Sequence, residues 1–92
     1  MTDDDEKNSD TQQVWLVHRE YTPRDLIVLE YATLDGERYV RKEKAARAAQ
    51  SGVTAAIDVP DDKLAPTDDA DVDRYRDEAR RMQEQHDPDD EI

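Results

Sequence analysis

The chain has 92 residues, of which 41% are charged and 35% are hydrophobic, and its formal net charge is -12. This length allows one small domain with a modest core. The chain has no cysteine, which excludes disulfides, thiolate nucleophiles and zinc sites of the cysteine type. Because no apolar run is long enough to span a membrane and the first residues are acidic, we expect a soluble, cytoplasmic protein without membrane contact.

The acidity comes mainly from aspartate, with 17 Asp to 8 Glu, and arginine outnumbers lysine by 9 to 4. In multimolar salt the Debye length falls to about 3 Å or less, so the repulsion within such a chain is largely screened. Composition of this kind is typical of proteins from salt-loving archaea. We therefore interpret the acidity as an adaptation to the solvent, which does not identify acidic or basic partners.

The two ends of the chain differ from its middle in composition. Residues 1–13 have no hydrophobic residue after Met1 and predict a disordered acidic tail, and residues 87–92 predict an acidic C-terminal tail. Apolar residues are concentrated between these ends. A single α+β domain is therefore expected over residues 14–86.

Three β-rich runs open the expected domain, at residues 14–21, 26–34 and 37–43. Asp35-Gly36, between the second and third runs, is a strong signal for a two-residue hairpin of type I′. That turn sets three cross-strand pairs, Ala32 with Tyr39, Tyr31 with Val40 and Glu30 with Arg41. A tight connection at residues 22–25 sets the other register, with Tyr21 opposite Leu26, Leu16 opposite Tyr31 and Val17 opposite Glu30. The sequence thus predicts a three-stranded antiparallel meander.

Two helices and a fourth strand complete the predicted order, βββαβα. Residues 42–50 are rich in alanine and predict a short helix that stops at Ser51-Gly52. Residues 53–59 predict the fourth strand, which ends at Pro60.

Residues 71–86 predict a C-terminal amphipathic helix. Its apolar stripe consists of Val72, Tyr75, Ala79, Met82 and His86. Oxygen atoms for capping its start are supplied by Thr67, Asp68, Asp69 and Asp71. This periodic segment is the clearest single element in the sequence.

Both faces of the predicted sheet are apolar, so both need cover. The face with more aromatic groups carries a strip formed by Trp15, Val17, Val28 and Tyr39. Tryptophan and tyrosine are enriched at interfaces because they bury a large area and keep a polar group. We therefore predict that this strip is the interface of a homodimer, with another protein partner also possible. The alternative is that the C-terminal helix covers the strip within a monomer.

Candidate metal ligands are few. His18 and Glu20 share a strand face, as two ligands would, but a metal needs three or four, and His86 is remote in sequence. The aspartate run at residues 68–73 begins like a calcium loop, but Arg74 occupies the position that requires glycine. We interpret these acids as helix caps and predict no metal site.

The sequence contains no motif of an enzyme or of a cofactor-binding protein. Its two serines lie outside any nucleophile elbow, and two glycines are too few for a phosphate-binding loop. A chain this short has little room for an enclosed site. We expect a protein that is not an enzyme, with no cofactor and no evident small-molecule substrate.

A basic stretch lies within this acidic chain and comprises Arg38, Arg41, Lys42, Lys44 and Arg47. One interpretation is an anion or nucleic-acid site beside Tyr39. Against it, Arg38 and Lys42 point to the strand face opposite that of Arg41, and high salt weakens phosphate contacts. We favour internal pairing, of Arg41 with Glu30 and of the other cations with the acidic segment after residue 58, and regard nucleic acid as the alternative partner.

The stretches "DLIVLEYATLDGERYV", "GVTAAIDVPDDKLAP" and "EARRMQEQHDPDDEI" make residues 14–92 resemble the small, uncharacterised acidic proteins of haloarchaea. This resemblance in style covers most of the chain. It implies no activity, and no functional residues follow from it. The sequence therefore predicts a halophilic, non-enzymatic structural or protein-interaction module, with nucleic-acid binding as the alternative.

Overall fold

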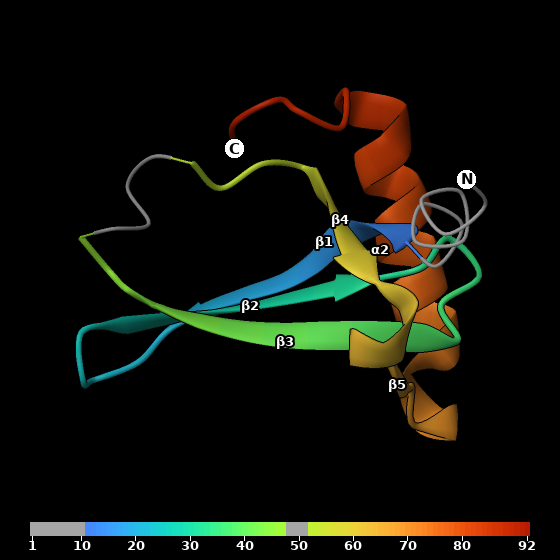
Figure 1. Ribbon diagram of the computed structural model, residues 1–92, viewed down its shortest axis with the longest axis horizontal. Coiled ribbons are helices and arrows are strands. Elements are labelled where there is room, and N and C mark those ends of the chain that lie inside the picture. The colour runs from blue at the N-terminus through green and yellow to red at the C-terminus, as the bar shows by residue number, and fades with distance from the viewer. Residues whose placement is uncertain (1–10, 48–51) are drawn as a thin grey trace, which may run out of the picture.

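A five-stranded antiparallel sheet packed against one long helix forms the protein (Figure 1). The computed structural model describes residues 11–47 and 52–92. The strands are β1 (Thr11–Tyr21), β2 (Leu26–Ala32), β3 (Arg38–Ala45), β4 (Ala56–Pro60) and β5 (Ala65–Pro66). They lie in the order β4-β1-β2-β3-β5, and the helix is α2 (Val72–Gln85). Two 3-10 turns, η2 (Asp61–Lys63) and η3 (Asp69–Asp71), flank β5. The predicted α+β class is confirmed.

The predicted order of elements is wrong between the meander and the fourth strand. Residues 42–45 continue β3, with Ala45 opposite Leu26, where a helix was expected. The ladder with β2 continues through Ile27–Lys44 and Leu26–Ala45, and this tertiary pairing overrides the local helix preference of alanine. Residues 48–50 of the expected helix lie outside the described part of the chain. The fifth strand, β5, was not predicted.

The register of β1 against β2 is correct in its first half only. Trp15 lies opposite Ala32 and Leu16 opposite Tyr31, but the pairing then shifts by one residue. His18, instead of Val17, lies opposite Glu30, and Tyr21 lies opposite Ile27 instead of Leu26. A β-bulge at Val17 causes the shift, because one extra residue in β1 moves each later side chain to the other face.

The hairpin between β2 and β3 has the predicted register but a different turn. Ala32, Tyr31 and Glu30 face their expected partners. Gly36 has φ of 75°, whereas Asp35 has no positive φ, so the turn is not type I′. The Gly36 N–H donates to the Thr33 carbonyl at 2.8 Å, which makes a four-residue loop built on an ordinary turn. A Cβ at Gly36 would meet the backbone of Val72 and Arg76, so this loop lies directly against α2.

The core has two clusters, one on each face of the sheet. The larger cluster consists of Val14, Leu16, Ile27, Leu29, Tyr31, Val53 and Val59. The smaller one consists of Trp15, Ala55, Ala56 and Ala79. Helix α2 covers the Trp15 face, where Tyr75 and Ala79 are its buried residues, and Met82 packs against both clusters. The predicted helix and its apolar stripe are confirmed. The small side chain of Ala79 allows the helix to pack closely against Trp15.

Both ends of the expected domain extend further than predicted. Strand β1 begins at Thr11, which pairs with Pro60 of β4. Residues 87–92, which the sequence predicted as a tail, return to the body, where the Ile92 N–H donates to the Val53 carbonyl at 3.0 Å and the Ala55 N–H to the Asp90 carbonyl at 2.9 Å. Ile92 packs against both core clusters, which gives this acidic segment one apolar anchor.

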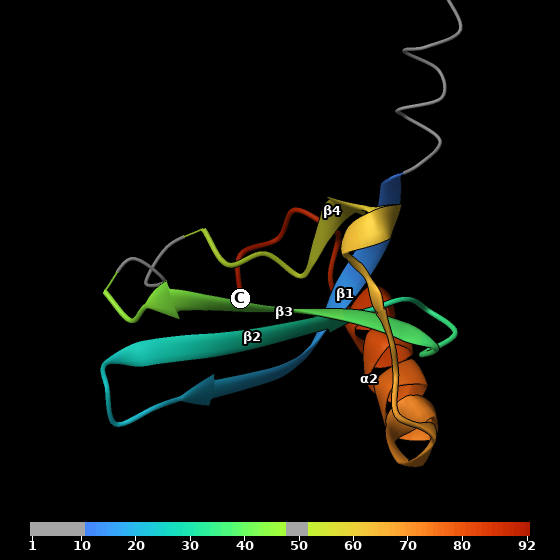
Figure 2. The same cartoon turned by 60° about the horizontal axis from the view of Figure 1, so that its bottom comes forward.

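The sheet has five strands at one end and three at the other. Strand β4 pairs only with residues Thr11 to Trp15 of β1, and β5 pairs only with Arg38 and Tyr39 of β3. Figures 1 and 2 show the remaining halves of β1, β2 and β3 projecting away from α2 as a twisted arm. The edges of this arm have no strand partner among the described residues.

Candidate functional site

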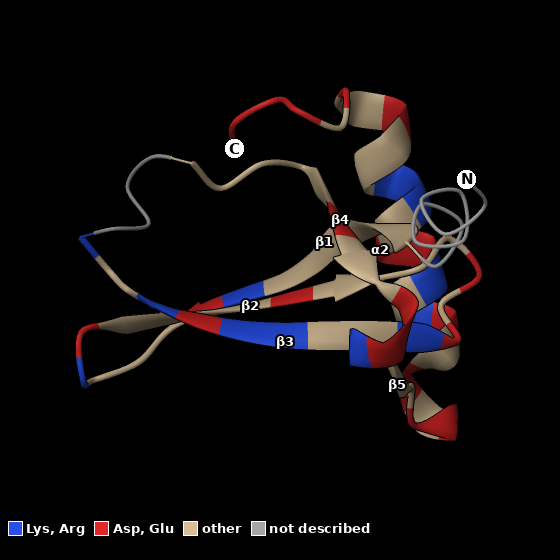
Figure 3. Ribbon diagram, viewed as in Figure 1, with Lys and Arg blue, Asp and Glu red and all other residues tan. Residues whose placement is uncertain are grey.

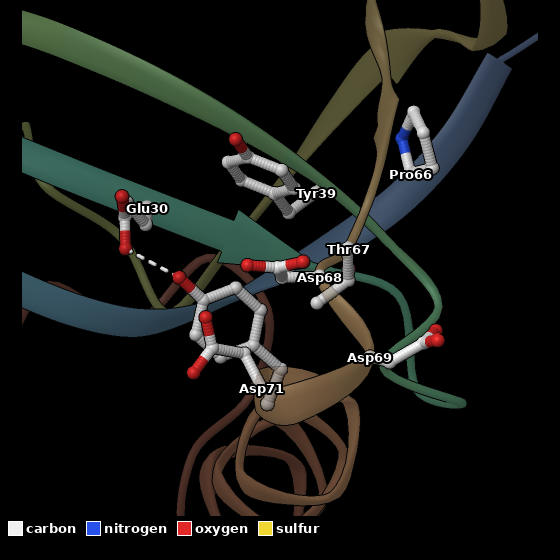
Figure 4. A pocket seen from close by; sticks show the side chains of 8 residues that line it. Glu30, Tyr39, Pro66, Thr67, Asp68, Asp69 and Asp71 are labelled. Atoms are coloured by element: carbon white, nitrogen blue, oxygen red, sulfur yellow. Dashed lines mark hydrogen bonds between the residues drawn. The ribbon is translucent and has the colours of Figure 1, made fainter.

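A pocket of about 490 Å³ lies where the start of α2 meets the sheet (Figure 4). Four segments line it: β2, β3, the end of β5, and the start of α2 with the preceding turn η3. Their lining residues are Glu30 in β2; Tyr39 in β3; Pro66, Thr67 and Asp68 at and after the end of β5; Asp69 and Asp71 in η3; and Tyr75 in α2. Four of these side chains are carboxylates and two are phenols. The pocket is therefore acidic and has an aromatic wall.

Tyr75 joins the helix to the sheet at the back of this pocket. Its hydroxyl donates a 2.6 Å hydrogen bond to Oε1 of Glu30, and the residue is buried (Figure 4). Burial, and then the hydrogen bond and the negative charge of Glu30, raise the pKa of the Tyr75 phenol. Tyr75 therefore remains neutral and keeps donating, while the second oxygen of Glu30 retains capacity to accept.

Tyr39 forms the aromatic wall together with Tyr75. The two ring centroids are 5.9 Å apart and the planes meet at 67°, an edge-to-face arrangement. Tyr39 reaches this position because its cross-strand neighbours are small, Ala32 on one side and Ala65 on the other. Half-buried Tyr39 thus presents ring surface to the pocket.

The carboxylates of the pocket differ in orientation and in partners. In the view of Figure 4 the Asp68 carboxylate lies below the Tyr39 ring, on the side of the pocket, whereas the Asp69 carboxylate points away from it. Asp71 accepts from Nη2 of Arg74 at 3.0 Å. Within the described residues, the carboxylates of Asp68 and Asp69 form no hydrogen bond or ion pair, and neither Asp68 nor Asp71 makes the side-chain cap that the sequence suggested. Asp68 therefore adds to the lining of the pocket a solvent-exposed negative charge that has no ion pair with a described residue.

Thr67 holds the segment that carries these acids. Its N–H donates to the Glu37 carbonyl at 2.9 Å, just beyond the short pairing of β5 with β3. Its side chain is buried, and its hydroxyl has no hydrogen-bond partner in the described part of the chain. A buried hydroxyl without a partner costs about 1–3 kcal/mol, so the wall of the pocket carries a destabilising group.

The chain shows how a cation is held at this wall. The guanidinium carbon of Arg74 lies 5.2 Å from the centroid of the Tyr75 ring while the same group binds Asp71. Stacking on a phenol and pairing with a carboxylate stabilise a cation together. Among the described residues no three His, Asp or Glu side chains are arranged to hold a metal ion. The arrangement suits an organic cation, an ammonium or a guanidinium.

The structure places two residues of the predicted interface strip inside the single chain. Trp15 is 2% exposed and Val28 is 5% exposed, and Val17 is half-buried near α2. Helix α2 packs against Trp15 and Val17 of this strip, as in the alternative arrangement, so the strip does not present a continuous surface to a dimer partner. Only Tyr39 of the four lines the pocket.

The basic residues of the stretch 38–47 lie along β3 and the turn that follows it (Figure 3). Arg38 binds Asp61 at 2.7 Å, which agrees with pairing to the segment after residue 58. Arg41 binds Glu43 at 3.2 Å, and not Glu30 as predicted, because Glu30 is directed to Tyr75. Lys42, Lys44 and Arg47 have no ion pair with a described residue, and the pleat places Lys42 and Lys44 on the face opposite Arg41.

The two histidines lie apart from the pocket. His18 contacts its neighbour Glu20 at 3.2 Å, and His86 lies 4.0 Å from Asp90. Both ends of each pair are at the surface, where such contacts contribute little to stability. Neither histidine brings together further ligands.

Sequence reasoning missed most of the pocket. Tyr75 was assigned to the apolar stripe and Asp68 and Asp71 to helix capping, and Glu30 was assigned to a pair with Arg41. The available signal was the run of aspartates at residues 68–71 directly before a helix whose first turn presents Tyr75 on its buried face. Its convergence with Glu30 and Tyr39 depends on β5, which has only two residues and no pattern of its own.

No helix in the described ranges is both long and apolar enough to cross a membrane. Neither the curated proteins nor the solved structures include a match to the chain. A family model described as a family of unknown function, DUF7967, matches residues 8–92. This match covers every element of the fold, from β1 to the returning C-terminal segment. The chain therefore belongs to the DUF7967 family.

Proposed function

We propose that the protein is a non-enzymatic interaction module that binds a lysine or arginine side chain of a protein partner in the acidic pocket. The observation that carries this proposal is the Asp68 carboxylate, which has no ion pair with a described residue and lines the pocket together with Tyr39 and Glu30. A cation placed between these groups gains two carboxylates and one ring face. It also neutralises a charge that no described residue of the chain compensates.

The chemistry of the pocket favours a cationic side chain over a neutral one. Hydrogen bonds between an ammonium and a carboxylate are about twice as strong as neutral ones, and a cation over a phenol adds about 0.5–1 kcal/mol at an exposed site. Arg74 already lies over the Tyr75 ring in the same manner, 5.2 Å from its centroid. The partner's cation therefore takes the position between Asp68 and Glu30.

Three further observations support binding of a protein partner over the other functions considered. Tyr75, with its raised pKa, serves as a fixed donor to Glu30 and not as a base, so it supports binding and not proton transfer. Lys42 and Lys44 lie on the face opposite Arg41, an arrangement that does not favour a nucleic-acid site. Binding through the Trp15 strip is not part of the proposal, because Trp15 and Val28 are buried.

We also propose that the protein works in concentrated salt. Its net charge of -12 and the acidic residues of the C-terminal segment support this (Figure 3). Salt screens exposed pairs strongly and partly buried pairs much less. A pocket with an aromatic wall is thus a suitable place for a charge-based contact under these conditions.

The test uses acetyl-Gly-Lys-Gly-amide as the probe and the shifts of the Tyr39 and Tyr75 ring protons as the readout. We expect binding with a Kd in the range of about 1 mM, which is usual for a single contact of about 4 kcal/mol. Asp68→Asn should weaken it about tenfold, equivalent to about 1.4 kcal/mol.

Asp69→Asn is the matched control, because it removes the same charge from a neighbouring carboxylate that points out of the pocket. It should leave the affinity unchanged, and a norleucine peptide should not bind. Equal losses in the two variants would mean that net charge attracts the peptide and that the pocket has no role.

A further inference from the structure

The outer edge of β3 is open next to the pocket. Strand β2 pairs with β3 as far as Ala45, whereas β5 covers only Arg38 and Tyr39. From Val40 to Ala45, the side of β3 that faces away from β2 has no strand partner among the described residues (Figure 1). An open edge of this kind is a template on which a further strand can pair.

The hydrogen bonds at the two ends of β3 show which backbone groups face outward. The Thr33 N–H donates to the Arg38 carbonyl and the Ala46 N–H to the Asp25 carbonyl, so even-numbered residues bond toward β2. Bonding direction alternates along an antiparallel strand. Arg41, Glu43 and Ala45 therefore direct their N–H and C=O groups outward.

We propose that the partner supplies its cation from an extended segment, which pairs antiparallel with β3 at Arg41–Ala45. This inference rests on the proposed function of the pocket and names the form of the partner. Backbone hydrogen bonds to the edge supply affinity, and the pocket supplies selectivity, as in other cases of strand addition.

The residue opposite Arg41 is the one whose side chain enters the pocket. It lies on the sheet face of Arg41 and Tyr39, diagonal to Tyr39 at about 7–8 Å, a distance that a long side chain spans. The Arg41 guanidinium binds Glu43, on the side of Arg41 away from Tyr39, and so leaves this path open. A lysine or arginine at that position reaches the Tyr39 ring.

The side chains on the other face of β3 determine which charges are favoured elsewhere in the partner segment. Lys42 and Lys44 have no ion pair with a described residue, and they project from the face of β3 opposite Arg41. Partner residues opposite them are favoured when acidic, because opposite charges directly across a strand pair stabilise it. In antiparallel order, the segment reads acidic, any residue, acidic, cationic. Lysines on an edge also discourage pairing with ordinary strands.

The probe for this inference is the peptide acetyl-Val-Glu-Thr-Glu-Lys-amide, with valine opposite Ala45 and lysine opposite Arg41. We expect it to bind at least about tenfold more tightly than acetyl-Gly-Lys-Gly-amide. It should slow amide hydrogen exchange at Arg41, Glu43 and Ala45. Lys42 and Lys44 should change little, because their amides already bond to β2.

Two N-methylated peptides test the backbone pairing. A methyl group on the threonine nitrogen blocks an amide that faces β3, and we expect about a tenfold loss of affinity. A methyl group on the nitrogen of the following glutamate blocks an amide that faces away, and the affinity should be kept. Equal affinity of both peptides and the unmodified peptide would overturn the strand pairing.

The same titrations separate the inference from the proposed function. If Asp68→Asn weakens binding but threonine methylation does not, cation binding in the pocket is supported and strand pairing with β3 is contradicted. If methylation weakens binding but Asp68→Asn and the norleucine peptide do not, the edge binds a strand and the pocket function fails. Without peptide, the amide protection of Arg41, Glu43 and Ala45 should not depend on protein concentration. A rise with protein concentration would assign this edge to a second copy of the chain and contradict the proposal.

Discussion

The hydroxyl of Tyr75 donates a 2.6 Å hydrogen bond to the Glu30 carboxylate, the side-chain bond that joins α2 to β2 at the pocket. A hydrogen bond to a charged group contributes about 1.5–3 kcal/mol, and Glu30 is only half-buried, which lowers this value. We expect Tyr75→Phe to reduce the free energy of unfolding by about 1–2 kcal/mol. Urea unfolding followed by the fluorescence of Trp15 measures the change. Tyr39→Phe, whose hydroxyl bonds to no described residue, is the control and should stay near the wild-type value.

The loop between β2 and β3 gives the protein a stability term that depends on pH. The hydrogen bond from the Thr33 hydroxyl to Asp35 at 2.6 Å, and then the Glu37 N–H, lower the pKa of the Asp35 carboxyl. A lowered pKa in the folded state means that the contribution is present above the ordinary value of about 3.9 and is lost as the pH falls below it. The difference in unfolding free energy between wild type and Asp35→Asn should therefore be largest near neutral pH and shrink below that value.

Urea titrations at several pH values measure this difference. Asp69→Asn, which removes an exposed carboxylate without a partner, provides the comparison. A difference for Asp35→Asn that stays constant down to pH about 2 would show that its hydrogen bonds do not distinguish the ionised form.

Two glycines allow backbone strain to be separated from steric contact. Gly36 and Gly52 have φ of 75° and 89°, so an alanine is strained at either position. No described residue lies within 4 Å of a Cβ at Gly52, whereas a Cβ at Gly36 would meet the Arg76 nitrogen at 2.6 Å. We expect Gly52→Ala to cost about 1–2 kcal/mol and Gly36→Ala about 1–3 kcal/mol more. Thermal unfolding of both variants measures this order, and equal losses would mean that the loop does not rest on α2.

Ile92 closes the body of the protein by packing against both core clusters. Removing most of a half-buried isoleucine side chain should cost about 1–2 kcal/mol, below the range of about 2–5 for a fully buried one. The Ile92→Ala variant should therefore unfold at a lower urea concentration, and its amides of Ala55 and Ala56, which donate to the Asp90 and Pro88 carbonyls, should exchange faster. The exposed neighbour offers a control, since Glu91→Ala should change neither quantity.

Salt should stabilise the protein. With a net charge of -12, repulsion between carboxylates opposes the folded state in dilute buffer, and ions screen it. We expect the unfolding temperature to rise when KCl is increased from about 0.1 M to about 2 M, where the Debye length falls from about 10 Å to a few ångströms. The same series with sucrose in place of KCl controls for general solute effects. A temperature independent of KCl would contradict halophilic adaptation.

The sequence was most informative where a local signal fixes a long-range pairing. Asp35-Gly36 placed Tyr39 opposite Ala32 correctly even though the turn itself was of another type, because both turns bring the strands into the same register. The bulge at Val17 has no local signal, since valine suits a regular strand equally well. The residues of β1 from His18 onward were therefore placed on the wrong face.

The pocket was harder to predict because its residues meet only through tertiary contacts. Asp68 reaches Glu30 and Tyr39 after β4 and β5 have carried the chain from one edge of the sheet to the other. Alanine at residues 45 and 46 favoured a helix, although pairing with β2 decides the outcome. Trp15 was assigned to an external interface because the sequence does not show that Ala79 lets α2 lie against it.

The contact between Gly36 and the backbone of α2 also bears on the order of folding events. Helix α2 can pack in its final position only after the β2–β3 hairpin has closed, because the loop of that hairpin supplies part of the surface that contacts the backbone of Val72 and Arg76. Pairing of β1 with β4 and the return of Ile92 to Val53 likewise join distant parts of the chain. Chains dominated by such non-local contacts fold slowly for their size. We therefore expect closure of the sheet, and not formation of the helix, to limit the rate of folding.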